Sequence, residues 1–107
     1  MKFCKRILLG IACLSAALSF TAHADPEAGR DKSFTCTGCH SSPGYRNAYP
    51  GYTVPKLGAQ KADYLEAALK AYRDGDRQHS TMHAQIAQMS DQDISDIAEY
   101  FSQLVKQ

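Results

Sequence analysis

The chain has 107 residues, of which 44% are hydrophobic, and its formal charge is +1 at pH 7. A chain of this length forms one small domain with limited apolar surface to bury. Its 12 Lys and Arg residues are balanced by 11 Asp and Glu residues, which excludes the strongly basic surface that nucleic acid or an anionic lipid would require.

The first 24 residues have the pattern of a cleavable export signal. Lys2, Lys5 and Arg6 precede an apolar run over residues 7–20, and Ala22-His23-Ala24 is a small-residue cleavage site. The apolar run is short for a membrane span and has no stop-transfer pattern beside it. We therefore predict a signal peptide that is removed after Ala24.

Removal of residues 1–24 leaves a mature domain of 83 residues, 25–107, which we expect in the periplasm with no membrane span. With nine Lys and Arg and eleven Asp and Glu, that domain has a charge of about −2. It therefore lacks the excess of basic residues that nucleic acid binding requires. Cleavage also removes two of the four cysteines. A lipid-modified Cys13 is an alternative that would tether the protein to a membrane, but Gly10 stands where such signals carry an apolar residue.

The motif Cys36-Thr37-Gly38-Cys39-His40 is typical of c-type haem attachment. Each thiol can add across one vinyl group of a porphyrin and become a thioether. The turn then places His40 against one face of the ring, as the proximal ligand of the iron. We expect Gly38 to let that turn form without a Cβ penalty.

Three other sites use similar residues. A thioredoxin-like dithiol would need a strand before the motif, and no period-2 apolar run precedes it. A zinc site would need four ligands, and the usual spacing between pairs is not matched. A disulfide between Cys36 and Cys39 is compatible with export but would constrain very little chain.

A short helix is expected before the motif. Asp25 can cap it, Pro26 suits its first position, and Glu27 favours the positive end of the helix dipole. We expect this helix to run to about Thr35 and to lead directly into the turn that carries the two cysteines. We also expect Phe34 to pack in the core.

Residues 41–58 are predicted to form a loop punctuated by proline and glycine. A backbone carbonyl near Pro55 is a candidate acceptor for the ring N–H of His40, which would determine the tautomer of that histidine. Three tyrosines lie in the loop: Tyr45, Tyr49 and Tyr52. Their rings either pack on the haem edge or anchor the loop, and the sequence does not decide between these two hypotheses.

Residues 60–73 are predicted to form an amphipathic helix that ends at Asp74-Gly75. One face carries five apolar or aromatic residues at helical spacing: Tyr64, Leu65, Ala68, Leu69 and Tyr72. We interpret this face as core and not as a cofactor-binding surface.

Residues 76–89 hold the candidates for a second iron ligand, the soft thioethers of Met82 and Met89. His79 and His83 lie four residues apart and could bind a metal together on a helix. We expect both histidines to be solvated surface residues instead.

A last helix is predicted from Ser90, with Asp93 at the reciprocal capping-box position. We expect it to cross the first helix and to bury Phe101, against Gly29. Its apolar face comprises Ile94, Ile97, Ala98, Phe101, Leu104 and Val105.

With these residues in place, the mature chain resembles the class I cytochromes c, most of all the small single-haem periplasmic cytochromes of bacteria and one half of their two-haem relatives. The matching segments cover nearly all of 25–107: the haem attachment motif, PKLGAQ at 55–60 with Tyr64-Leu65, YRDGDR at 72–77, Met82, and SDQDI to AEYF at 90–101. The resemblance implies an all-α fold in which a few helices wrap round one haem and the terminal helices cross.

The resemblance also implies the roles of the site residues. Cys36 and Cys39 would hold one haem c covalently, His40 would be the proximal ligand, and Met82 would be the distal ligand. Met89 would be a packing residue. The chain departs from the family at Ser41, where glycine is usual after the ligand histidine, and in its tyrosine-rich loop.

Together these features predict a periplasmic one-electron carrier of a respiratory chain. Two protein ligands leave no open position on the iron, so we expect no enzymatic activity. Its partners would be redox proteins that dock transiently at an exposed haem edge. Two alternatives remain open: a haem-bearing subunit of a periplasmic dehydrogenase or oxidase complex, and a gas-binding haem sensor with a displaceable methionine.

Overall fold

The structure is a computed structural model that describes residues 22–48 and 51–105; most of the predicted signal, residues 1–21, and Tyr49 lie outside them. The described residues form an all-α fold with no β-strand, only an isolated bridge between Arg46 and Thr53. Its helices are α1 (Pro26–Lys32), α2 (Phe34–His40), α3 (Ala62–Asp74), α4 (Ser80–Ile86) and α5 (Asp91–Gln103). None of these helices has the length and apolar character needed to cross a membrane.

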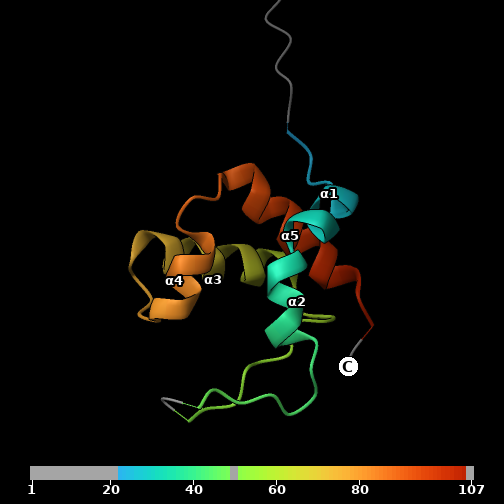
Figure 1. Ribbon diagram of the computed structural model, residues 1–107. Coiled ribbons are helices and arrows are strands. Elements are labelled where there is room, and N and C mark those ends of the chain that lie inside the picture. Colours follow the sequence, from blue (N-terminus) through green and yellow to red (C-terminus); the bar gives the residue numbers. More distant parts are fainter. Residues whose placement is uncertain (1–21, 49–50, 106–107) are drawn as a thin grey trace, which may run out of the picture.

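The helices form one cluster, with the loop that follows α2 extending from one end of it (Figure 1). Helix α1 packs against α5, α3 packs against both α4 and α5, and α4 lies over α3. The predicted crossing of the first and last helices is therefore confirmed. A core of Leu65, Ile97, Ala98 and Phe101 lies between α3 and α5.

Gly29 lies where α1 crosses α5. A Cβ atom at this position would collide with the backbone carbonyl of Asp96 and would lie 2.9 Å from the Cβ of Tyr100. The close approach of the two helices thus requires a glycine. The expected partner was Phe101, but the atoms nearest this position belong to Asp96 and Tyr100.

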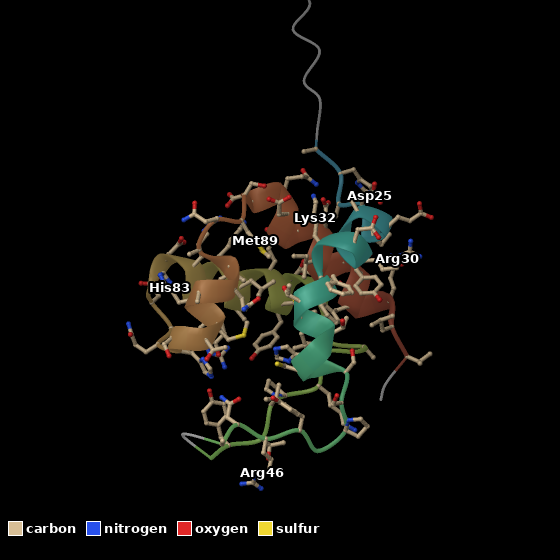
Figure 2. All side chains as sticks on the ribbon, in the orientation of Figure 1. Asp25, Arg30, Lys32, Arg46, His83 and Met89 are labelled. Atoms are coloured by element: carbon tan, nitrogen blue, oxygen red, sulfur yellow. The ribbon has the colours of Figure 1, made fainter. Side chains whose placement is uncertain are left out.

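A buried carboxylate joins the two crossing helices. Asp96 of α5 accepts hydrogen bonds from Lys32 Nζ at 2.6 Å, from the Asp25 backbone N–H at 2.8 Å and from Gln92 Nε2 at 2.7 Å. Burial opposes ionisation of Asp96, but these donors outweigh it and lower its pKa below the ordinary value. Lys32 also pairs with Asp93 at 2.8 Å, and Figure 2 shows Lys32 beside Asp25 where α1 and α5 meet.

The chain changes direction at Ser33, between α1 and α2. The side chain of Ser33 is fully buried, and its hydroxyl donates to the carbonyl of Arg30 at 3.0 Å, which satisfies a backbone group at the end of α1. The expectation of one helix running to Thr35 is therefore wrong. So is the expectation that Phe34 packs in the core, because the helical register of α1 does not continue past Ser33 and the ring is 81% exposed.

Three of the predicted helix caps are confirmed. Asp25 caps α1 by accepting from the N–H groups of Glu27 and Ala28, and Gly75 ends α3 in the left-handed conformation at φ 87°. Ser90 and Asp93 form the complete capping box of α5. Val105, however, lies beyond the end of α5 and is 83% exposed, so its assignment to the apolar face was wrong.

Candidate functional site

A cavity of about 250 Å³ lies at the centre of the helical cluster. Its walls come from α2, α3, α4 and α5 and from the end of the loop, and most of the lining surface is apolar. Its principal lining residues are Cys36, Cys39, His40, Val54, Leu57, Leu65, Ala68, Leu69, Tyr72, Met82, Ile86, Ile97 and Phe101. An apolar cavity of this size among four helices and a loop of one small domain is a site for a ligand that completes the core.

The attachment motif lies on α2 and not in a turn. Cys36 and Cys39 are three residues apart on this helix, so both thiols lie on one side of it and line the cavity. Gly38 is helical, has no positive φ and has nothing within 4 Å of a Cβ built on it, so the expectation that it lets a tight turn form is wrong.

The two thiols are free, and no disulfide joins them. Burial raises the pKa of the Cys36 thiol, which makes it a poor nucleophile for thiol–disulfide exchange. The element before the motif is a helix, whereas a thioredoxin-like site would follow a strand. Among residues 22–48 and 51–105, no three His, Cys, Asp or Glu side chains come together in a way that could hold a metal ion by themselves.

His40 is buried, with Nδ1 2.7 Å from the backbone carbonyl of Pro55. A carbonyl oxygen only accepts, so Nδ1 carries the proton and donates it in this bond. The other ring nitrogen, Nε2, is then the one with a lone pair available to a metal. The predicted acceptor near Pro55 is confirmed.

The structure separates the two candidate methionines. Met82 is on α4, is partly buried and lines the same cavity as His40. Met89 follows α4, does not line the cavity, and packs against the core around Phe101. A cysteine pair, a histidine with a free Nε2 and one thioether therefore share a single apolar cavity.

The apolar face of α3 has a second role besides the one we expected. All five of its residues line the cavity, while only Leu65 is buried and Tyr64 is 52% exposed. The interpretation of this face as core is confirmed for Leu65, which belongs to the buried cluster, and for Leu69, which packs against it. Its exclusion as a cofactor surface was wrong, because the same face also lines the cavity. Helical periodicity identifies an apolar face, but the same face can pack on protein or on a ligand.

The loop tyrosines have no contact with the cavity in the part of the chain that the structure describes. Tyr45 is exposed, and the ring of Tyr52 packs edge-on against the ring of His79, with centroids 5.1 Å apart. Neither residue lines the cavity, which favours the hypothesis that both rings anchor the loop.

Polar side chains also line the cavity, and their place there could not be predicted from sequence pattern. Asn47, Arg77, His79 and Gln85 line it, and the guanidinium of Arg77 lies 4.7 Å from the centroid of the Tyr72 ring. His79 is partly buried, so describing it as a solvated surface residue was wrong, whereas His83 is exposed as expected. No apolar periodicity marks such residues, because they come from different elements.

The sequence profile of the family described as cytochrome c matches residues 27–104. The chain belongs to the class I cytochromes c. It is 47% identical over 81 residues to cytochrome c-554(548) of Halomonas halodenitrificans, a match that covers 73% of this chain and 94% of that protein.

Two further relatives are longer than this chain. Cytochrome c4 of Pseudomonas aeruginosa is 36% identical over 97 residues, covering 89% of this chain and 47% of the relative. A thiosulfate dehydrogenase electron acceptor of Thiomonas intermedia is 30% identical over 99 residues, covering 92% of this chain and 44% of the relative. This chain thus spans about half the length of each and carries one attachment motif.

The cofactor of the family is covalently attached haem c, and the single motif corresponds to one haem. The residues around the cavity fit that group. Two free thiols are at attachment spacing on one wall, the His40 tautomer leaves Nε2 for iron, and the remaining walls are mostly apolar. The protein is accordingly a haem electron carrier.

Proposed function

We propose that the protein is a periplasmic one-electron carrier of a respiratory chain, with no enzymatic activity of its own. Cys36 and Cys39 would hold the haem as thioethers, and His40 and Met82 would be the axial ligands of its iron. The observation that carries this proposal is the shared cavity, which brings a histidine with a free Nε2 and a thioether together beside both thiols. When bound, the haem supplies a one-electron Fe(II)/Fe(III) couple.

Residues around the cavity would influence the reduction potential of the haem iron. The hydrogen bond from His40 to Pro55 keeps the imidazole in one tautomer and orientation and raises its basicity as a ligand. The soft thioether of Met82 favours the reduced metal. The apolar walls exclude water, which disfavours the additional positive charge of the oxidised state. The last two effects raise the reduction potential.

Two protein ligands would leave no coordination position for a substrate, so chemistry on a bound substrate is not part of the proposal. The partners would be redox proteins that dock briefly through a small interface. Export would follow from the basic and apolar pattern of residues 1–24, and the charge of the mature domain gives no reason for binding to nucleic acid.

The ligand assignment is tested by two matched substitutions. Met82→Ala should remove the methionine–iron charge-transfer band of the oxidised protein, whereas Met89→Ala should leave it in place. The opposite result would transfer the ligand role to Met89. Colour that separates from the chain in acidified acetone would refute covalent attachment by Cys36 and Cys39.

A second candidate is an electron-accepting subunit of a periplasmic dehydrogenase. It is favoured by the relative named as a thiosulfate dehydrogenase electron acceptor, which matches almost the whole chain. A free carrier should elute from a sizing column as a protein of its own mass after gentle release from the periplasm. A subunit should co-elute with a larger enzyme and lose its reduction by that enzyme's substrate when separated.

A further inference from the structure

Helix α4, which carries Met82, has few buried contacts of its own. It is seven residues long, and Ile86 is its only buried residue. A helix this short is not stable by itself in water, so its position depends on what its ends and faces contact. Two histidines flank Met82 on this segment, three residues before it and one residue after it.

His79 is the N-cap of α4. Its backbone is extended at φ −167° and ψ 106°, and its Nδ1 accepts a hydrogen bond from the backbone N–H of Met82 at 3.3 Å. Because an N–H group can only donate, this Nδ1 is the acceptor of the bond. The ring also packs edge-on against Tyr52 of the loop at 5.1 Å and Tyr72 of α3 at 6.1 Å.

His83 joins the same helix to α3 by a different bond. Its Nδ1 lies 2.9 Å from the backbone carbonyl of Tyr72 and donates to it. Tyr72 is in the last turn of α3, where carbonyl groups have no partner within the helix. His83 thus satisfies a free carbonyl while it holds α4 in place, and it lies on α4 away from α1 and α2 (Figure 2).

We propose that His79 and His83, both anchored on Tyr72, form a brace that positions Met82 and determines how readily its thioether is displaced by an external ligand. The two histidines are positioning residues. His79 accepts a hydrogen bond from the backbone N–H of Met82, and His83, the residue after Met82, donates one to the Tyr72 carbonyl of α3. This inference rests on the proposed role of Met82 and deepens it. It also explains why two histidines lie beside a thioether without being needed as ligands.

The test uses the mature protein with its haem attached and carbon monoxide as the probe of the reduced state. His79→Ala should raise the rate of carbon monoxide binding about fivefold, the factor that corresponds to losing an N-cap of about 1 kcal/mol. His79→Asn restores a good N-cap and should return the rate close to that of the parent protein. His83→Ala should raise the rate about twofold, and His83→Gln, which keeps an N–H donor, should not.

Gln78→Ala is the matched control. Gln78 lies next to His79 and bonds the carbonyl of Gly75, but it makes no bond to α4. It should leave the carbon monoxide rate unchanged. His79→Ala removes a cap from the native state, so it should also lower the midpoint of global unfolding, about as much as Ser90→Ala does by removing the cap of α5. Of these two variants, only His79→Ala should raise the carbon monoxide rate, whereas a merely structural role would raise that rate equally in both.

Two results would overturn the brace. One is an unchanged rate in His79→Ala, and the other is an equal rise in His79→Ala and His79→Asn. Failure of the ligand assignment is distinguishable from both, because Met82→Ala would then retain the charge-transfer band. In that case the parent protein has no Met82 thioether bond to displace, and the brace is overturned together with the ligand assignment.

Discussion

The α1–α5 crossing and the α4 segment are held in place by different means. At the crossing, Gly29 lets two helices approach closely, and buried Asp96 binds three donors from two helices and the chain before α1. Helix α4 has one buried residue and is held through exposed or partly buried histidines. The α1–α5 crossing thus depends on contacts between distant parts of the chain, whereas the segment that carries Met82 depends on a few local hydrogen bonds.

This difference has a consequence for dynamics. Elements with few buried apolar contacts open with less free energy than global unfolding requires. Helix α4 should therefore open while α1, α2 and α5 remain folded. A carrier built this way keeps its haem through the attachment motif even when the thioether side is disturbed.

The largest expected effect is at the closest helix contact. Gly29→Val should destabilise the protein by more than about 3 kcal/mol, because the new side chain meets the backbone of Asp96, which cannot move without separating α1 from α5. Denaturant unfolding of the haem-bearing protein measures it. Gly38→Ala is the control, since a Cβ there meets nothing and alanine favours the helix. A Gly29 variant as stable as the control would contradict the close crossing.

A smaller effect is expected for the buried carboxylate. Asp96→Asn should cost about 2 kcal/mol at neutral pH, because the charge-assisted hydrogen bonds from Lys32 and the Asp25 N–H are weakened. The measurement is the free energy of unfolding in urea at a fixed pH. An unchanged stability would show that Lys32 is held by Asp93 alone.

The pH dependence of stability follows from the same carboxylates. Lys32 lowers the pKa of Asp93, and the pKa of Asp96 is also lowered, so both groups release protons more easily in the folded than in the unfolded state. Their contribution is complete above the unfolded value of about 3.9 and is lost as pH falls through the folded values. The free energy of unfolding should therefore be compared at pH 5 and pH 2, about one unit above and two units below that value. Asp96→Asn should lose less of it than the parent protein does, because the variant has no carboxylate at this position to protonate.

The cap of α5 should give a still smaller effect. Ser90→Ala should lower stability by about 1 kcal/mol, since the serine oxygen accepts from the Asp93 N–H and completes the capping box. Ser102→Ala makes the same change near the other end of α5, where the hydroxyl only donates to a carbonyl within the helix. Thermal unfolding should separate the two, and equal melting temperatures would contradict the role of the cap.

The smallest effect is expected at Phe34. Phe34→Ser should change the free energy of unfolding by less than about 0.5 kcal/mol, because the ring is 81% exposed and leaves the core unchanged. Denaturant unfolding checks this. A loss as large as that expected for Asp96→Asn would mean that the ring is buried after all, as its apolar character alone had suggested.

Several features could be predicted from the sequence because they depend on short stretches of chain. The attachment motif, the caps at Asp25, Gly75 and Ser90, and the apolar face of α5 all follow from residue type and spacing within one or two helical turns. The hydrogen bond from His40 to the Pro55 carbonyl was also predicted, from the need of a metal-binding imidazole for a partner.

Other features were decided only by the tertiary structure. Whether Phe34 faces solvent depends on the change of direction at Ser33, and whether the face of α3 meets protein or the cavity depends on where α4 and α5 lie. The bonds of Asp96 to Asp25 and Lys32 span more than sixty residues of sequence. By itself, then, the sequence determined the attachment motif and the helix ends at Asp25, Gly75 and Ser90, because those depend on local chemistry. Packing between distant segments decided where the chain breaks at Ser33 and which helix faces meet the cavity.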